Sequence, residues 1–377
     1  MPIKLLPASM EKAAMLGMHM ANELLSPSAA IITLVIGAAA VGWASIRARR
    51  GMEAQRLPLM GVLGAFVFAG QMINFTLPGM PGTSGHLGGG VLLAILLGPA
   101  AGVVVMSAVL IIQCLLFQDG GLLALGCNIV NMGLVPCLLG GWLYKAILGA
   151  AARAAAWRQY IAAWAACILG LTAGAAMVPL EAAIGGRLMI ATGDFLAVMV
   201  GVHLLIGLVE GLITFVVIAY IRQVRPGVLG LQAGQRPARQ GGRIGAKALA
   251  ASLVGTALLL AGVVSWFAST HPDGLEWAYQ EHRYAGQGGA VVKAPSGAVA
   301  TVDAWQAKWS VLSDYGKRPA PLGQQPPRQD PPLESATGEW GQVDGWRSLA
   351  GLTGTLATLG VVLAVSAALR PKRTMPA

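Results

Sequence analysis

Long apolar runs separated by short polar stretches dominate the chain. A helix needs about 20 mostly apolar residues to cross a bilayer, and most of these runs reach that length. The pattern predicts nine helical segments, at residues 28–46, 57–75, 86–97, 99–117, 122–148, 159–183, 194–221, 245–268 and 348–369. The third segment is short, and Gly98 and Pro99 separate it from the fourth. Residues 86–117 are therefore expected to form a tight helical hairpin, with one bent helix as the alternative.

Lys and Arg gather in four short stretches beside the apolar segments, at 47–56, 145–158, 222–247 and 370–373. Such basic connections mark the cytoplasmic side of a membrane protein. All four share one side only if residues 86–117 cross the membrane twice, so the charges favour the hairpin and nine spans. Residue 18 is then expected outside the cell and the C-terminus inside.

The composition supports an all-α, polytopic membrane helix bundle. Of the 377 residues, 55% are hydrophobic and only 11% are charged, whereas soluble domains carry about 25% charged residues. The net charge of +10 is explained by membrane orientation and does not indicate nucleic acid. The P-loop pattern G-x-x-x-x-G-K-[ST] is absent from the sequence, so ATP hydrolysis by that motif is not expected.

Two membrane units are predicted. A basic linker at 226–243 separates a unit at 18–225 from a unit at 244–377, in which two spans bracket a long external loop at 269–346. This loop is rich in Pro, Gln, Gly and charged residues, and long loops are translocated regardless of charge. Residues 1–17 are too weakly apolar for a signal peptide, so they are either a leader of another kind or a misassigned start.

His86 is the most conspicuous polar residue, because it stands in GTSGHLGGG (82–90) beside apolar segments. Glycine permits close backbone approach, and the hydroxyls of Thr83 and Ser84 are candidates to hold one nitrogen of the ring. An ionisable side chain within a membrane segment indicates a functional site. The alternative is a histidine at a helix start that only hydrogen-bonds its loop.

Further polar and sulfur-bearing residues are expected on the same side of the membrane as His86. They are Met18, His19 and Met20 before the first span, Asn74 at the end of the second, and Asp119, Asn128 and Asn131 around the start of the fifth. Methionine and histidine suit Ni, Cu or Co, whereas Mg and Ca prefer oxygen. For Asn128 or Asn131 alone, an interhelical hydrogen bond is the favoured interpretation. Asp119 is equally consistent with a turn.

The seventh segment carries two polar residues, His203 and Glu210, on one helix face. At 1.5 Å per residue they lie about 10 Å apart, so they cannot pair directly. They are expected to line an ion path, to dock a partner subunit or to form a structural network.

Four motifs together resemble the CbiM/NikM family, the substrate-capture (S) subunits of energy-coupling factor transporters for cobalt and nickel. They are MHM (18–20), GTSGHLGGG (82–90), DGGLLALGCNIVNM (119–132) and HLLIGLVEGLIT (203–214). HPDGLEWA (271–278) resembles the PDGLE module of the accessory N subunit. The resemblance implies a fused protein, with a seven-helix S unit and a two-span N-like unit.

The resemblance also implies a metal site. Its ligands would be the terminal amine of Met18, the amide and ring nitrogens of His19, and the ring of His86. A near-planar set of four nitrogens favours Ni(II) or Cu(II). Seventeen residues precede Met18, so we expect translation to start at Met18, with leader removal or a site without the amine as alternatives. All these ligands precede residue 90, so the second unit is not expected to contribute to binding.

Three functions compete. A capture subunit for Ni²⁺ or Co²⁺ would need a separate membrane coupling (T) subunit and cytoplasmic ATPase subunits. A stand-alone divalent-cation channel or secondary carrier would need carboxylates within its spans, and few are present besides Glu210. An intramembrane enzyme is disfavoured because the HExxH and GxSxG motifs are absent. No catalytic residue or cofactor is predicted, and the sequence does not decide between nickel and cobalt.

Overall fold

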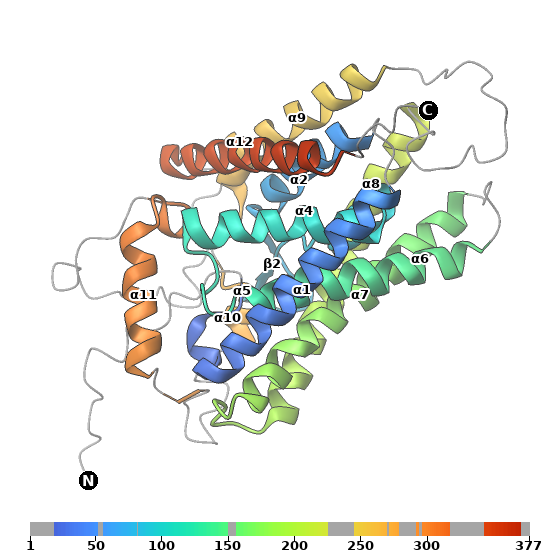
Figure 1. Ribbon diagram of the computed structural model, residues 1–377. Coiled ribbons are helices and arrows are strands. Elements are labelled where there is room, and N and C mark those ends of the chain that lie inside the picture. The colour runs from blue at the N-terminus through green and yellow to red at the C-terminus, as the bar shows by residue number, and fades with distance from the viewer. Residues whose placement is uncertain are drawn as a thin grey trace, which may run out of the picture.

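The computed structural model describes residues 19–51, 56–80, 82–149, 156–224, 245–269, 271–278, 292–293, 296–316 and 343–370. Met18, the predicted leader at 1–17 and the predicted linker at 226–243 lie outside these described residues. Within the described parts almost every regular element is helical (Figure 1).

The first predicted unit contains eight α-helices interrupted by π-helical turns. They are α1 (Pro27–Gly51), α2 (Leu57–Gln71), α3 (Gly90–Leu97), α4 (Pro99–Ile112) with η3 (Gln113–Phe117), α5 (Leu125–Asn128) with η4 (Ile129–Leu134) and η5 (Pro136–Gly140), α6 (Gly141–Leu148), α7 (Ala156–Ile184) and α8 (Thr192–Val224). A 3-10 turn, η1 (Asn22–Leu24), precedes α1. The strands β1 (Phe75–Thr76) and β2 (Ser84–Gly85) pair antiparallel, with Phe75 opposite Gly85.

The second predicted unit contributes the remaining helices. They are α9 (Ala246–Gly262) with η7 (Val264–Phe267), α10 (Gly274–Ala278), α11 (Gly297–Trp309), η9 (Ser313–Tyr315) and α12 (Gly345–Ala368). The N-cap residues Ser296 and Asp344 accept hydrogen bonds from backbone amides of α11 and α12. These bonds satisfy donors that lack partners at a helix start.

The all-α, multi-pass prediction is confirmed, but the count of nine full spans is not. Six helical segments in the described residues are long and apolar enough to cross a membrane: 27–51, 99–117, 125–148, 156–184, 192–224 and 345–368. The helices α2 and α9 are apolar but shorter. Helix α3 has eight residues, about 12 Å of rise, which is less than half of a bilayer core.

The segment 86–117 contains two helices and not one bent helix. Gly98 separates them with φ +91°, and Pro99 begins α4. A Cβ atom on Gly102 would lie 3.1 Å from the backbone nitrogen of Ala94, so the two helices fold back on each other. The first of them begins at Gly90 and not at residue 86, because Gly89 adopts a left-handed conformation with φ +79°.

The two predicted units share one core. Helix α12 packs across α2, with α9 beside both (Figure 1). Small residues permit this close approach: a Cβ atom on Gly61 would lie 2.6 Å from Cγ of Leu363, and one on Gly354 would lie 2.0 Å from Cζ of Phe68. Close helix contacts through glycine are typical of membrane bundles.

Part of the predicted external loop is helical and docks onto the first unit. Gln306 on α11 is buried and donates hydrogen bonds to the carbonyl oxygens of Cys114 (3.0 Å) and Gly120 (2.9 Å). It also accepts one from the amide of Leu122 at 2.9 Å. These contacts fix the turn between η3 and α5, which carries Asp119.

Candidate metal site

A cavity of about 60 Å³ lies where the four sequence motifs of the first unit meet. Its polar and sulfur-bearing lining consists of His19, Met20, His86, Asn128, Asn131, Met132, Met199 and His203. These residues come from the segment before α1, the loop after β2, the helical segment from α5 into η4, and α8. Helix α10 of the second unit adds Leu275.

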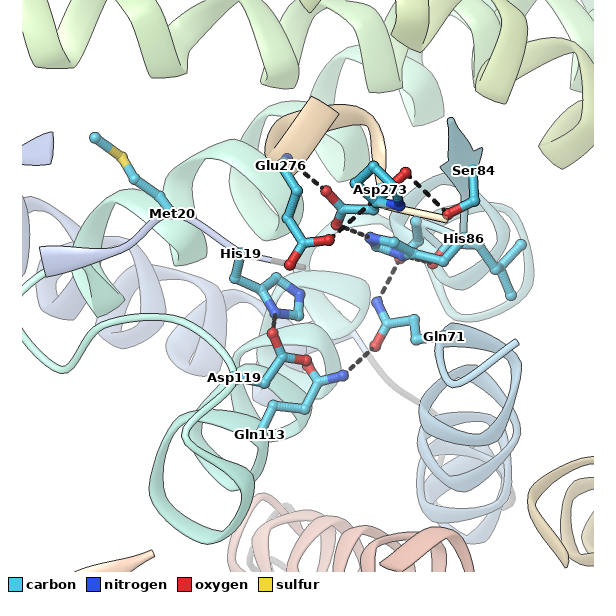
Figure 2. Close-up of polar contacts among 12 residues, drawn as sticks. His19, Met20, Gln71, Ser84, His86, Gln113, Asp119, Asp273 and Glu276 are labelled. Carbon is cyan, nitrogen blue, oxygen red and sulfur yellow. Dashed lines mark hydrogen bonds and ion pairs between the residues drawn. The ribbon is translucent and has the colours of Figure 1, made fainter. Parts of the chain in front are cut away.

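His19 is almost completely buried, at 2% exposure, and its two ring nitrogens differ. Nδ1 lies 2.7 Å from Oδ1 of Asp119 (Figure 2). Nε2 is buried and has no hydrogen-bond partner among the described residues. A buried polar atom without a partner is costly, so this nitrogen is a candidate to bind a ligand.

The backbone beside His19 is fixed by Asn128. The amide of Met20 donates to Oδ1 of Asn128 at 2.9 Å, and Nδ2 of Asn128 donates to the carbonyl of Met20 at 3.1 Å. Gly120, with φ +85°, permits the close approach, because a Cβ atom there would lie 2.8 Å from Cβ of His19. The segment that carries His19 is therefore held against the turn that carries Asp119.

Asp119 is the charged partner of His19. Burial alone would raise the pKa of this carboxyl, but the charge of His19 and hydrogen bonds from His19 and Tyr315 outweigh burial and lower it. The Tyr315 hydroxyl donates to Oδ2 at 2.5 Å. The carboxylate thus has a partner on each oxygen, and one partner comes from the second unit.

His86 lies in a non-helical segment between β2 and α3. Its Nδ1 is 3.1 Å from the carbonyl oxygen of Leu87, and its Nε2 is 3.8 Å from Oδ2 of Asp273. The centroids of the His19 and His86 rings are 6.0 Å apart, with an interplanar angle of 58°. Two imidazoles from distant parts of the chain therefore face one small cavity.

Asp273 reaches His86 from the PDGLE motif of the second unit (Figure 2). Asp273 and Glu276 cap α10 reciprocally, because each side chain accepts from the other's backbone amide, at 2.8 and 3.1 Å. β2 holds the motif through hydrogen bonds of 2.8 Å from Ser84 Oγ to the carbonyl of His271 and from the Ser84 amide to that of Pro272. Burial, reinforced by the charge of Asp273, raises the pKa of Glu276 to about 8.

The remaining residues that the sequence suggested for the metal site differ in whether they line the cavity. Thr83 and Ser84 direct their hydroxyls to the second unit rather than to the His86 ring. Asn131 donates to Oε2 of Glu181 at 2.8 Å and lines the cavity, and its own Oδ1 is buried with no partner in the described part of the chain. Oδ1 of Asn74 is likewise buried and bonds none of the residues that the structure describes, but Asn74 is not part of the lining.

His203 and Glu210 on α8 have different environments. The His203 ring lines the cavity, and its Nδ1 lies 2.8 Å from the carbonyl oxygen of Met199. Since a carbonyl only accepts, Nδ1 carries the proton and Nε2 has the free lone pair. Glu210 is absent from the lining and instead accepts from the backbone amides of Gly88 and Gly89.

The side chains of the described residues do not by themselves form a complete metal site. Among the described residues, no three His, Cys, Asp and Glu side chains are grouped so that they could hold an ion. The imidazoles of His19 and His86 would therefore need additional donors to hold an ion. The set implied by the family resemblance takes those donors from main-chain nitrogen, and one of them belongs to Met18, outside the described residues.

Sequence reasoning missed the contribution of the second unit. Asp273 and Glu276 belong to the recognised PDGLE motif, but nothing in the sequence places that motif beside His86. Tyr315 stands in no motif at all, and only the tertiary structure brings it to Asp119.

Comparison with known proteins agrees with these motifs. The model of the CbiM family, described as the cobalt uptake substrate-specific transmembrane region, matches residues 19–228. The model of the PDGLE domain matches residues 247–371. The chain therefore belongs to the CbiM family and carries a PDGLE domain after the CbiM region.

Relatives with known names support the same conclusion. An Archaeoglobus fulgidus protein named for fused nickel transport, NikMN, is 40% identical over 213 residues, covering 56% of this chain and 68% of its own. A Haloquadratum walsbyi protein named for metal transport is 37% identical over 57% of this chain and 94% of its own. Separately from that support, the chain also aligns with the crystal structure of a truncated transition metal transporter, with a TM-score of 0.46 at 27% identity, over 54% of this chain and 97% of the other chain.

The family, the relatives and the apolar helices together define a class. The chain is a multi-pass membrane component of metal transport and a transport subunit rather than an enzyme.

Proposed function

We propose that this chain captures Ni²⁺ or Co²⁺ at the outer face of the cell membrane, as the substrate-binding subunit of an energy-coupling factor importer. The observation that carries the proposal is the pair of imidazoles, His19 and His86, with ring centroids 6.0 Å apart at one cavity. Imidazole nitrogen suits nickel and cobalt, and the buried His19 ring has one nitrogen, Nε2 in the structure, that bonds none of the described residues. A T subunit and ATPase subunits would supply the energy.

The proposed ligands are His19, His86 and the main-chain nitrogens of residues 18 and 19. A six-membered chelate ring with the His19 amide requires Nδ1 of the imidazole, but Asp119 holds that nitrogen at 2.7 Å. A half-turn of the ring about Cβ–Cγ would free Nδ1 for the ion, put Cδ2 in its place and move Nε2 to the side of the ring that faces Asp119, where a small shift of the ring would be needed for a hydrogen bond. Carboxylates commonly hold the second nitrogen of a metal-binding histidine in this way.

The proposed orientation places the His19–His86 cavity outside and the C-terminus in the cytoplasm, as the basic connections favour. The alternative, a channel or secondary carrier, needs a carboxylate along the ion path. Glu210, the buried carboxylate on α8, is bound to two backbone amides instead of lining the cavity, which weakens that alternative.

Two measurements test the proposal. Titration of the purified chain with Ni²⁺ and Co²⁺, after mass spectrometry has defined its N-terminus, should show one tight site per molecule. Uptake into cells should require coexpressed T and ATPase subunits. Uptake by the chain alone at the same rate would favour the carrier, and absence of binding would refute capture.

A further inference from the structure

The segment that carries His86 is held by its backbone. We call residues 86–89 the glycine loop. The amide of Gly88 donates to Oε2 of Glu210 at 2.8 Å, and that of Gly89 donates to Oε1 at 3.0 Å. In addition, Nε2 of Gln71 donates to the carbonyl oxygen of Gly88 at 2.9 Å (Figure 2). Helices α8 and α2 thus fix three consecutive backbone groups of this loop.

This arrangement is buried and connected to a third helical element. Glu210 is 1% exposed, and Gln71 is fully buried. Gln113 in η3 donates from Nε2 to Oε1 of Gln71 at 3.0 Å, so the glutamine that holds the loop is itself oriented. A carboxylate buried within a membrane bundle is expensive and usually serves a function.

Glycine suits both positions that Glu210 binds, because a side chain would displace Glu210 at one and strain the backbone at the other. A Cβ atom on Gly88 would lie 2.8 Å from Oε2 of Glu210, inside normal contact distance. Gly89 has φ +79°, which L side chains rarely adopt. The same glycines would leave the loop highly flexible if the side-chain contacts were absent, because glycine restricts the backbone least.

We propose that Glu210 is a positioning residue for metal capture, which fixes the glycine loop so that the His86 ring stays beside His19. This inference rests on the proposed function. Without both hydrogen bonds, His86 would sample many positions, and binding would have to overcome the entropy of ordering it. Glu210 itself touches no ion in this proposal.

The test counts imidazoles on a bound ion. Cu²⁺, a nickel-like probe, is added in substoichiometric amount to the purified full chain, and pulsed electron paramagnetic resonance reports the number of coordinated imidazoles. Wild type should show two and His86→Ala one. Glu210→Gln, which keeps the size but offers one acceptor, should show one, with Cu²⁺ affinity lowered about 10- to 100-fold.

The matched control is Thr214→Val, which changes another fully buried polar residue one turn further along α8. It should retain two imidazoles. Glu210→Asp keeps the charge and replaces Glu210→Gln if that variant fails to fold by thermal denaturation. The double variant Glu210→Gln/His86→Ala should match His86→Ala.

The outcomes separate the inference from the function on which it rests. Two imidazoles in a folded Glu210 variant, at wild-type affinity, would overturn the positioning role and leave the capture site intact. One imidazole in Thr214→Val would also overturn it, because any buried change in α8 would then have the same effect. Equal counts in wild type and His86→Ala would refute the capture site itself.

Discussion

The two histidines proposed as ligands, His19 and His86, are held in different ways. His19 is fixed through its side chain, because Asp119 binds Nδ1 at 2.7 Å and Tyr315 binds the same carboxylate at 2.5 Å. His86 is fixed mainly through its backbone, and among the described residues the polar partners of its ring are a carbonyl at 3.1 Å and the Asp273 carboxylate at 3.8 Å. Loops therefore orient one ring, whereas membrane helices position the other.

This difference suggests how the site would assemble. The ring of His19 is held by Asp119, which lies in the turn between η3 and α5, and Tyr315 of the second unit donates to the same carboxylate, so movement of that turn would change the orientation of the ring. The partners of the glycine loop, Glu210 and Gln71, belong to α8 and α2 and are part of the bundle. His86 would act as the fixed donor, and the segment with His19 as the donor that adjusts.

The largest effect is expected from removing the fixed donor. His86→Ala should reduce Ni²⁺ binding below detection in isothermal titration, because it deletes the only proposed ligand supplied by the bundle. His271→Ala, a histidine outside the cavity lining, serves as the control and should bind normally. Equal Ni²⁺ affinity in the wild type, His86→Ala and His271→Ala would show that His86 is only a loop residue.

Asp119→Asn should weaken Ni²⁺ binding by about 10- to 100-fold, the range typical for the carboxylate partner of a metal-binding histidine. An amide keeps the shape but loses the charge that orients the His19 ring. Equilibrium dialysis would measure the change. Tyr315→Phe should act in the same direction and more weakly, because it removes one neutral donor to this carboxylate. Unchanged affinity in Asp119→Asn would contradict orientation through Asp119.

Asp273→Asn should have a smaller effect than Asp119→Asn, about five-fold or roughly 1 kcal/mol, because 3.8 Å is beyond hydrogen-bond distance. The sequence alone predicted no contribution of the second unit to binding. Competition titration can resolve a change of this size. If Asp273→Asn lowered the affinity as much as Asp119→Asn, then carboxylates would hold the His19 and His86 rings in the same way.

The smallest effect on binding is expected from His203→Ala. Its Nδ1 is engaged by the carbonyl of Met199, and the proposed ligand set is complete without it. Affinity should stay within about two-fold, or ~0.5 kcal/mol. Parallel uptake measurements would show whether the ring, which lines the cavity, acts later in transport. A large loss of affinity would make His203 a ligand.

The sequence predicted most of the helices and singled out His19 and His86, which meet at the cavity. Apolar runs of sufficient length predict membrane helices, because the bilayer requires them. Each of the nine predicted apolar segments contains a helix, but α3 is only eight residues long. Its shortness could not be predicted, since the start at Gly90 depends on the left-handed Gly89 and on Glu210 of a distant helix.

The sequence by itself determined the class of protein, the order of the apolar segments and the motifs that carry His19 and His86. These properties depend on local composition and spacing. Only the tertiary structure decided which groups hold those histidines. The histidines are held directly by Asp119 and Asp273, and indirectly by Tyr315 through Asp119 and by Glu210 through the glycine loop. These residues lie far away in the chain, and their contacts depend on how helices pack rather than on any neighbouring residue.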